Sequence, residues 1–286
     1  MSSLCYINGN FVPAEQASIP AMDRGFLFGD GVYEVVAVMD GLLLEFERHA
    51  ARLARSLAEI GIANPLPRER LLEVCRELIR RSALREGSIY LQITRGADTK
   101  RDFAFPKGVE PTVMMFTAEK VLSVNPLADS GVRVASVPDL RWARRDIKSV
   151  SLLAQVLAKQ AAQSSGAFEA LMVDAQGVVT EGSSSSALLV NDADEIVVRP
   201  LSNDILPGCT RAAVLALAAE RNMKVVERTF TLQECMQARE VILTSALHFV
   251  LPVIAIDDQP VAGGKPGPVC AALRTLYLRH AMATAL

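Results

Sequence analysis

The chain has 286 residues, of which 50% are hydrophobic, 22% charged and 5% aromatic. This apolar content excludes an intrinsically disordered chain, and the length favours about two compact domains. Thirty basic and 32 acidic residues give a formal net charge of -2, so no strong positive field is available to hold nucleic acid or an anionic membrane surface.

The first third of the chain has the pattern of an α+β unit. Asn8-Gly9-Asn10 is typical of a tight hairpin turn, and apolar residues first alternate and later recur at helical spacing. In chain order the pattern predicts a hairpin at 5–13, a hairpin from Gly31–Met39 to Leu42–Phe46, helices over 47–60 and 68–82, strands at 88–95 and 112–117, and an irregular polar loop at 96–110.

The remainder of the chain alternates predicted strands and helices. We expect strands at 132–137, 170–174, 178–181, 187–190, 196–198, 224–230, 240–244 and 253–256, and helices at 152–164, 210–221 and 268–282. Turn residues and weak periodicity mark 121–131 as an interdomain linker. The sequence thus predicts a small N-terminal α/β domain, 1–120, and a larger C-terminal domain, 132–286.

The cysteines and histidines do not favour a metal site. The five cysteines are widely spaced and form no C-x-x-C pair, and there are only three histidines. Reduced cysteines, no signal-peptide pattern at the start and no apolar run of ~18 residues together predict a cytoplasmic protein that does not enter a membrane.

Nucleotide-binding and hydrolase motifs are missing. Gly29-Asp30-Gly31 begins a dinucleotide fingerprint, but Glu34 stands where its third glycine is required. No G-x-S-x-G sequence is present for a serine nucleophile.

Lys148 is a candidate nucleophile, because it lies between a predicted strand and an apolar helix, close in sequence to Arg144 and Arg145. A lysine must be neutral part of the time to act as a nucleophile, which requires burial or a cationic neighbour. A solvated surface lysine is the alternative interpretation of the same residue.

Two further segments could hold an anionic ligand. Glu181 ends a predicted strand just before Ser183–Ser186, a turn whose N–H groups and hydroxyls could surround an anion and whose glutamate could pair with a protonated ring nitrogen. Thr210 opens a helix after Leu206-Pro207-Gly208, and helix N-termini bind phosphate. A flexible serine loop and a simple helix cap are the alternatives.

These pieces follow one another in a fixed order: Asp23-Arg24-Gly25-Phe26-Leu27-Phe28-Gly29-Asp30-Gly31-Val32-Tyr33-Glu34, His49-x-x-Arg52-Leu53, Asp139-Leu140-Arg141-Trp142, Asp146-Ile147-Lys148-Ser149, Thr180-Glu181-Gly182-Ser183-Ser184-Ser185 and Leu206-x-Gly208-x-Thr210-Arg211. Together they resemble the fold-type IV enzymes that use pyridoxal 5'-phosphate (PLP), over nearly the whole chain. The resemblance implies a two-domain α+β or α/β fold whose larger C-terminal domain has a β-barrel-like sheet and helices.

Within this family the chain looks most like the D-amino acid (D-alanine) transaminases. Tyr33-Glu34-Val35-Val36 is the local pattern of that branch, whereas branched-chain transaminases usually carry Tyr-Glu-Gly there. The resemblance implies a ping-pong reaction in which a D-amino acid such as D-alanine leaves as its 2-oxo acid. A second 2-oxo acid, 2-oxoglutarate or pyruvate, then accepts the amino group.

The resemblance also implies residue roles. Lys148 would form a Schiff base with PLP and carry the proton between substrate Cα and cofactor C4', while Glu181 would keep the pyridine nitrogen protonated. The other implied cofactor-binding residues are Arg52, Thr210 and the Cys209 and Thr210 N–H groups at the phosphate, Leu206 on the ring face, and Gly208, Ser245 and Ala246. The implied substrate-binding residues are Tyr33 and Arg101 at the α-carboxylate, with Val35, Phe103, Ser183, Ser184, Ser185 and Leu247.

The chain departs from the D-amino acid branch in the loop expected to bind the carboxylate. That branch typically has Arg-x-His, but here the sequence is Arg101-Asp102-Phe103 in a loop one residue longer. Ser186 and Ala246 replace an Asn and a Thr of the family. Because phenylalanine cannot donate a hydrogen bond, we expect reduced dependence on an α-carboxylate and some activity with (R)-primary amines.

Alternatives on the same fold are an (R)-amine transaminase and a branched-chain L-amino acid transaminase; the pattern around Tyr33 disfavours an aminodeoxychorismate lyase. A protein of a different class, which kept the fold for binding without PLP, would lack the cofactor colour. The family further implies a homodimer with active sites near the interface, and no metal.

Overall fold

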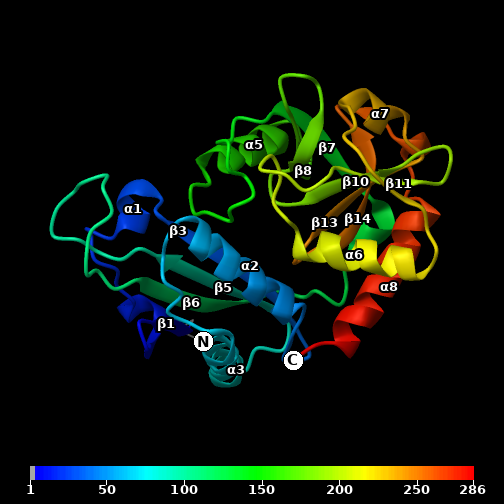
Figure 1. Cartoon of the computed structure of the whole chain (residues 1–286). Helices are drawn as coiled ribbons and strands as arrows, with labels where there is room; N and C mark the ends of the chain where they lie inside the picture. The colour runs from blue at the N-terminus through cyan, green and yellow to red at the C-terminus, as the bar shows by residue number, and fades with distance from the viewer. Residues whose placement is uncertain (1–3) are drawn as a thin grey trace. The chain divides into compact units, whose positions relative to one another are not determined.

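Two groups of elements divide the chain in the computed structural model, which describes residues 4–286 (Figure 1). The first unit contains residues 4–123, Ile147–Ser151 and Thr284–Leu286. The second contains Val124–Asp146 and Leu152–Ala283. The short segment Ile147–Ser151 therefore belongs to the first unit, although the chain on both sides of it belongs to the second. The domain limits expected from the sequence stay a prediction.

The first unit is built on a six-stranded antiparallel sheet with the order β2-β1-β6-β5-β3-β4. Alternating apolar residues place one face of this sheet against the helices. Its elements are β1 (Leu4–Ile7), β2 (Asn10–Pro13), η1 (Ala14–Gln16), α1 (Arg24–Phe28), β3 (Gly31–Met39), β4 (Leu42–Leu43), α2 (Phe46–Glu59), α3 (Arg68–Ser82), β5 (Gly87–Thr94) and β6 (Thr112–Glu119).

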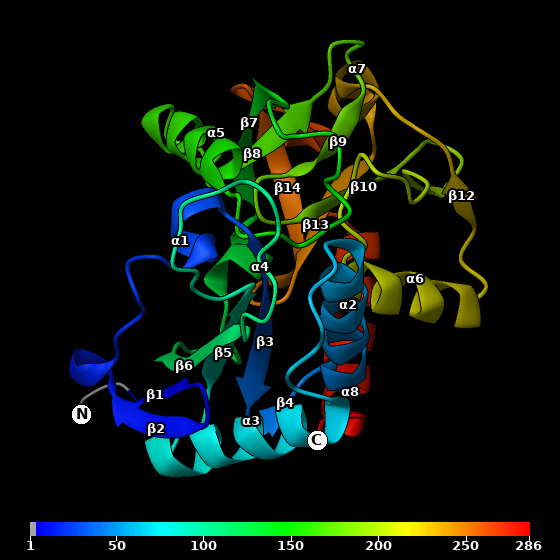
Figure 2. The same cartoon turned by 60° about the vertical axis from the view of Figure 1, so that its left-hand side comes forward.

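Two amphipathic helices cover this sheet. Helix α2 packs on β3, and α3 packs on β1 and β6; Figure 2 shows α2 running alongside β3. Leu53, Leu57, Leu71 and Leu78 are buried at helical spacing and form one hydrophobic core with residues of the strands. The apolar stripes predicted for these two helices therefore face the sheet.

The second unit is built on a curled nine-stranded sheet with the order β12-β11-β10-β13-β14-β7-β8-β9, in which β15 also pairs with β14. Its elements are α4 (Pro126–Ser130), β7 (Val132–Pro138), α5 (Leu153–Ser164), β8 (Glu169–Val173), β9 (Val179–Gly182), β10 (Ser186–Val190), β11 (Ile196–Val198), α6 (Cys209–Glu220), β12 (Val225–Glu227), α7 (Leu232–Gln237), β13 (Glu240–Ser245), β14 (Phe249–Ile256), β15 (Gln259–Pro260), η2 (Ala262–Gly264) and α8 (Pro268–Ala283).

The curl of this sheet brings β9 next to β10, although they are not neighbours in the strand order. The Gly182 N–H donates to the Ser185 carbonyl at 2.7 Å where the two strands meet. Helix α5 packs on β7 and β8, and α6 packs on α8 and β13 (Figure 1). The sheet is thus partly closed, as expected for a β-barrel-like sheet.

Several segments differ from the sequence-based expectation. The strand expected at 253–256 begins earlier, at Phe249, as β14, and helix α4 lies within the stretch expected to be a linker. The strand predicted over Leu42–Phe46 ends at Leu43, because Glu45 has a left-handed φ of 53° and α2 begins at Phe46. Helix α1 was not predicted; it is short and is capped by the Asp23 side chain. The strand predicted over 224–230 is reduced to β12, Val225–Glu227.

We expect Leu78→Ala to lower the free energy of unfolding by about 2–5 kcal/mol, because Leu78 is fully buried between α3 and the sheet and its removal leaves a cavity. Val121→Ala is the control in the same unit. Val121 is 65% exposed, so its replacement should change stability by less than about 0.5 kcal/mol. Denaturant unfolding measures both; equal effects would contradict the assigned core.

Candidate active site

Lys148 lies in the loop Ile147–Ser151, which adds to the first residues of β3. The Tyr33 N–H donates to the Lys148 carbonyl at 3.0 Å, and Ser149 forms an antiparallel bridge with Val32. The Lys148 Nζ lies 4.1 Å from the centroid of the Tyr33 ring. The backbone of Lys148 is therefore fixed to the sheet, and the amine reaches the face from which Tyr33 projects.

The two faces of β3 carry different groups. Tyr33 and Val35 project from one face and Glu34 from the opposite face, since side chains alternate along a strand. The Tyr33 ring stacks on the Tyr90 ring at 5.8 Å, and Tyr90 stacks on Phe116 at 4.9 Å. Burial, together with the neighbouring Tyr33, raises the pKa of Tyr90 to about 12. Tyr33 and Val35 therefore share their face with a neutral aromatic row.

On the opposite face, Glu34 binds two residues of helix α2. Arg52 donates from Nε and Nη2 to the two Glu34 oxygens, each at 2.8 Å, and His49 Nδ1 lies 2.7 Å from Glu34 Oε2. All three side chains are buried. Burial opposes ionisation of Glu34, but the charges and hydrogen bonds of Arg52 and His49 outweigh it and hold the pKa of Glu34 well below its usual range. The Arg52 guanidinium is thus fixed by an ionised carboxylate.

Residues 96–110, which we call the substrate loop, carry Arg101 and Phe103 at exposed positions; Phe103 is 76% exposed. The Arg101 guanidinium lies 5.0 Å from the Phe28 ring centroid and 5.6 Å from that of Phe103. Among residues 4–286, the structure shows no hydrogen bond or ring contact that joins Arg101 or Phe103 to Tyr33. The structure therefore places Arg101 and Phe103 beside Phe28 of α1.

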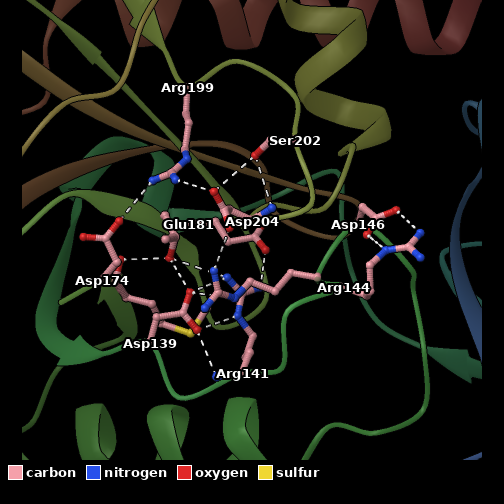
Figure 3. A network of polar contacts seen from close by, with 12 residues as sticks. Asp139, Arg141, Arg144, Asp146, Asp174, Glu181, Arg199, Ser202 and Asp204 are labelled. Carbon is pink, nitrogen blue, oxygen red and sulfur yellow. Dashed lines mark hydrogen bonds and ion pairs between the residues drawn. The ribbon is translucent and has the colours of Figure 1, made fainter. Parts of the chain in front are cut away.

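In the second unit, Arg141 joins two acidic side chains (Figure 3). Its Nη1 donates to Glu181, while Nη2 and Nε donate to the two Asp139 oxygens at 2.7 and 3.0 Å. The Thr180 hydroxyl also donates to Asp139, at 2.7 Å. Burial opposes the ionisation of Asp139, but Arg141 holds the pKa of Asp139 below its usual value. One guanidinium is therefore shared by two carboxylates.

Glu181 is buried at the end of β9. The Leu206 N–H donates to its two oxygens at 3.2 and 3.3 Å. Burial raises the pKa of the Glu181 carboxyl, and the charge and hydrogen bond of Arg141 oppose that effect without cancelling it. Glu181 is thus a buried carboxyl held in place by Arg141 and by the Leu206 N–H, with a pKa above that of an ordinary glutamate.

Glu169 anchors the serine turn, Ser183–Ser186, that follows Glu181. The Ser183 and Ser184 hydroxyls donate to the two Glu169 oxygens, the second at 2.6 Å. Glu169 is 2% exposed, and Lys159 Nζ lies 3.7 Å from it. The Ser185 hydroxyl is also buried and has no hydrogen-bond partner within residues 4–286. Two of the three predicted serines are therefore engaged, and the third is available to a ligand.

Helix α6 begins beside the first residue of β10, Ser186, and its first N–H groups have no side-chain cap. Its N-cap is Gly208, which supplies no side-chain cap, and Cys209 and Thr210 are buried in the first turn. A Cβ on Gly208 would lie 2.7 Å from the Ser186 hydroxyl, so a larger residue there would force the Ser186 side chain to move. Ser186 pairs with Thr244, whose buried hydroxyl finds no partner in the described chain. The first N–H groups of α6 and the buried Thr244 hydroxyl thus both lie next to Ser186.

Ser245, Ala246 and Leu247 lie where β13 ends and turns toward β14. The Ser245 hydroxyl accepts from the His248 N–H at 3.3 Å, which closes the turn. Ser245 follows Thr244 directly, so this turn borders the same N-terminus of α6. The predicted residues Ser245 and Ala246 are therefore near Gly208 in the second unit.

Sequence reasoning assigned no role to Glu34, Asp139, Arg141 or Glu169. Two signals could have found them: Glu34 alternates with Tyr33 on β3 opposite the i, i+3 pair of helix α2, and Arg141 stands two residues after Asp139. Glu169 has no such local signal. Within the part of the chain that the structure describes, no group of three or more His, Cys, Asp or Glu side chains is arranged to hold a metal ion.

Comparisons with known proteins find similarity to aminotransferases over most of the chain. The profile of the family described as "Amino-transferase class IV" matches residues 31–256. D-alanine aminotransferase of Staphylococcus aureus (strain COL) is 39% identical over 276 residues, 96% of each chain, and that of Bacillus licheniformis is 37% identical over 268 residues, 94% of this chain and 93% of the relative. The structure of a T.th. branched-chain amino acid aminotransferase with pyridoxamine 5'-phosphate superposes with a TM-score of 0.90 at 27% identity, covering 99% of this chain and 95% of the other.

The pairing of Glu34 predicts a pH-dependent contribution to stability. At pH 7, Glu34→Gln should lower the free energy of unfolding by about 3–5 kcal/mol, because it leaves the buried Arg52 without its carboxylate. The pKa of Glu34 is lower in the folded chain than the ordinary value of 4.5, so this contribution is complete above that pH and is lost as the pH falls below it.

The difference in the free energy of unfolding between wild type and Glu34→Gln should therefore become smaller as the pH is lowered. Glu119→Gln, at an exposed position of β6, is the control and should change little at any pH. Urea unfolding between pH 3 and 8 measures the three curves. A gap that stays constant below about pH 4.5 would contradict the ionised pair.

Proposed function

This chain belongs to the class IV aminotransferases, and on that premise we propose that it transfers the amino group of D-amino acids such as D-alanine to 2-oxo acids, either 2-oxoglutarate or pyruvate. The observation that carries the proposal is the 39% identity to a D-alanine aminotransferase along 96% of both chains. The similarity to branched-chain aminotransferases, at 27% identity, supports the shared fold.

Family membership confirms three predictions made from the sequence. The chain has the fold of type IV aminotransferases, with one antiparallel sheet and one curled sheet. It is an aminotransferase, and it depends on PLP. The residues that serve the cofactor and the substrate are proposed below.

The donor set of the second unit fits a phosphate group. The open N–H groups at the start of α6 and the unpartnered hydroxyl of Thr244, which pairs with Ser186 beside Gly208, offer hydrogen bonds without a positive charge. We propose that Gly208, Cys209, Thr210, Ser245 and Ala246 surround the phosphate, and that the Arg52 guanidinium, oriented by Glu34, supplies the charge.

When bound, PLP supplies an aldehyde that reacts with amines and a ring that draws electrons from the substrate Cα. Glu181 would hold the proton of the pyridine nitrogen, and Leu206 would pack on the ring while its N–H keeps Glu181 oriented. Because Arg141 favours the ionised form of Glu181, it keeps this carboxylate able to pair with a pyridinium.

Lys148 would attach the cofactor and then move the proton between the substrate Cα and the cofactor C4'. Its backbone bond to Tyr33 restricts the motion to the side chain, which suits an amine that must serve two atoms in turn. Tyr33 and Val35 would line the same side of the site. The Tyr33 phenol and Arg101 would bind the α-carboxylate, and Ser183, Ser184, Ser185 and Leu247 would line the pocket.

Phe103 is the observation that favours a second activity. It stands where the D-amino acid branch typically has a histidine, and its ring cannot donate to a carboxylate. We therefore propose turnover of some (R)-primary amines beside D-amino acids. An (R)-amine or branched-chain L-amino acid transaminase remains the alternative.

A homodimer is proposed from the exposed apolar face of helix α5. Leu153, Val156 and Leu157 follow the i, i+3, i+4 spacing and are 71%, 58% and 57% exposed, whereas Ala158 and Ala162 of the same helix face the sheet. The exposed Arg101 and Phe103 also suit a loop that completes the site of a second copy.

A cytoplasmic location is proposed from the five cysteines, which are all buried free thiols. Within residues 4–286, no helix combines the length and apolar character needed to cross a membrane.

A substrate panel tests the proposed function. The absorption spectrum of the PLP-loaded protein is followed after adding D-alanine, D-glutamate, L-leucine or (R)-1-phenylethylamine. We expect fast conversion with the D-amino acids, slower conversion with the amine and none with L-leucine. Lys148→Ala should slow conversion by at least about 100-fold, because it removes the proton carrier.

Lys224→Ala is the matched control, since Lys224 is an exposed residue paired with Glu195. It should react as the wild type does. Faster conversion by L-leucine than by D-alanine would contradict the proposal and indicate a branched-chain L-amino acid transaminase. Equal rates for Lys148→Ala and wild type would remove Lys148 from the mechanism.

The dimer has a separate test. Leu157→Asp should shift the protein toward the monomer in sedimentation velocity, because it places a charge within the apolar face of α5. Leu201→Asp is the control, at an exposed position (58%) outside that helix. A wild type that sediments as a monomer with full activity would refute the proposal.

A further inference from the structure

Arg24, in the motif that runs from Asp23 to Glu34, holds the backbone of the substrate loop. Its Nη1 donates to the carbonyl of Asp102 at 2.6 Å and its Nη2 to the carbonyl of Phe103 at 3.1 Å. Arg24 is 3% exposed, although the two residues that it binds are exposed. The loop conformation on both sides of Phe103 thus depends on a buried guanidinium outside the loop.

Asp30 orients this guanidinium. Arg24 Nε donates to Asp30 Oδ2 at 2.8 Å, and Arg95 donates to both Asp30 oxygens at 2.7 and 3.0 Å. Burial opposes ionisation of Asp30, but Arg95 and Arg24 hold its pKa below the usual value. Asp30 is thus an ionised carboxylate between two guanidiniums, and this fixes the direction of the remaining Arg24 donors.

Arg95 connects the same network to helix α2. It donates to the carbonyls of Ile60 and Gly61, just after that helix ends, at 2.6 and 3.2 Å. Its guanidinium carbon lies 3.5 Å from the centroid of the Phe105 ring. Loop residue Phe105 and the helix that carries Arg52 are therefore held by one arginine.

The start of α1 is fixed tightly enough to make Arg24 a rigid support. Asp23 accepts from the Gly25 N–H at 2.8 Å and from the Thr94 hydroxyl at 2.9 Å, and the Arg24 N–H donates to Gly96 at 2.9 Å. A Cβ on Gly25 would lie 2.2 Å from a Thr94 methyl group, so glycine is required there. The backbone that carries Arg24 cannot shift without breaking these contacts.

We propose that Arg24 is a positioning residue that sets the conformation of the substrate loop and thereby the preference for substrates that carry an α-carboxylate. The inference rests on the proposed function, in which Arg101 binds that carboxylate. Arg24 contacts the backbone on the two residues after Arg101, so it presents the Arg101 side chain without touching the substrate. Its loss should weaken substrate binding and leave proton transfer by Lys148 intact.

The first test separates binding from chemistry in the PLP-loaded enzyme. Arg24→Met should raise the KM for D-alanine by about tenfold or more while kcat changes less than about threefold. The KM for (R)-1-phenylethylamine, which has no carboxylate, should not rise in the same way. Arg24→Lys, which retains one donor, should recover part of the loss. Arg68→Met is the matched control, because Arg68 pairs with Glu47 on the exposed surface.

The second test does not depend on activity. Lys100 and Arg101 are exposed, so trypsin can report the mobility of the loop in the protein without substrate. The first cut after either residue should be faster by about tenfold in Arg24→Met than in Arg68→Met, because the loop opens locally. If Arg24→Met does not fold, Asp30→Asn is used instead, because Asp30 orients Arg24. We expect the same rise in the KM for D-alanine and the same faster cleavage.

Unchanged KM and unchanged cleavage in a folded Arg24 variant would overturn the inference. A parallel loss of kcat for D-alanine and for the amine would also overturn it, since that pattern indicates general damage. A wild type inactive with every D-amino acid would refute the proposed function instead, and the cleavage rates would still decide whether Arg24 holds the loop.

Discussion

Buried guanidinium groups bonded to carboxylates determine where the functional side chains of both units can lie. Glu34 fixes Arg52 in the first unit, and Arg141 fixes Glu181 in the second. A buried charge is stable only when its partner is well oriented, and an arginine presents its donors in a planar fork. Each pair therefore holds its members in one geometry within its own unit.

The same pairs control charge as well as position. A carboxylate that pairs with a pyridinium has to be shielded from water, yet burial raises its pKa and favours the neutral form. Arg141 opposes this effect, but it also gives two of its hydrogen bonds to Asp139. Glu181 thus shares its cation with a second acid, and its basicity stays higher than in an exclusive ion pair. This balance suits a residue that holds a proton on a ring nitrogen throughout a reaction.

Local patterns in the sequence predicted several elements accurately, because hydrophobic periodicity reflects burial on one face. The strand Gly31–Met39 and the helix Arg68–Ser82 have the predicted bounds. Long-range polar contacts leave no such pattern. Arg24 and Asp102 are 78 residues apart, and Ser183 meets Glu169 across two strands. Motif resemblance selected the residues proposed for the site, but the partners that orient them became visible only in the folded chain.

Chemical trapping shows which lysine carries the cofactor, which we propose to be Lys148. The chain has seven lysines, and borohydride reduction of the PLP-loaded protein fixes the cofactor to whichever one holds it. We expect a phosphopyridoxyl group on Lys148 in the tryptic peptide that begins at Asp146, in one equivalent per chain. Label on another lysine, or no label after loading with excess PLP, would contradict it.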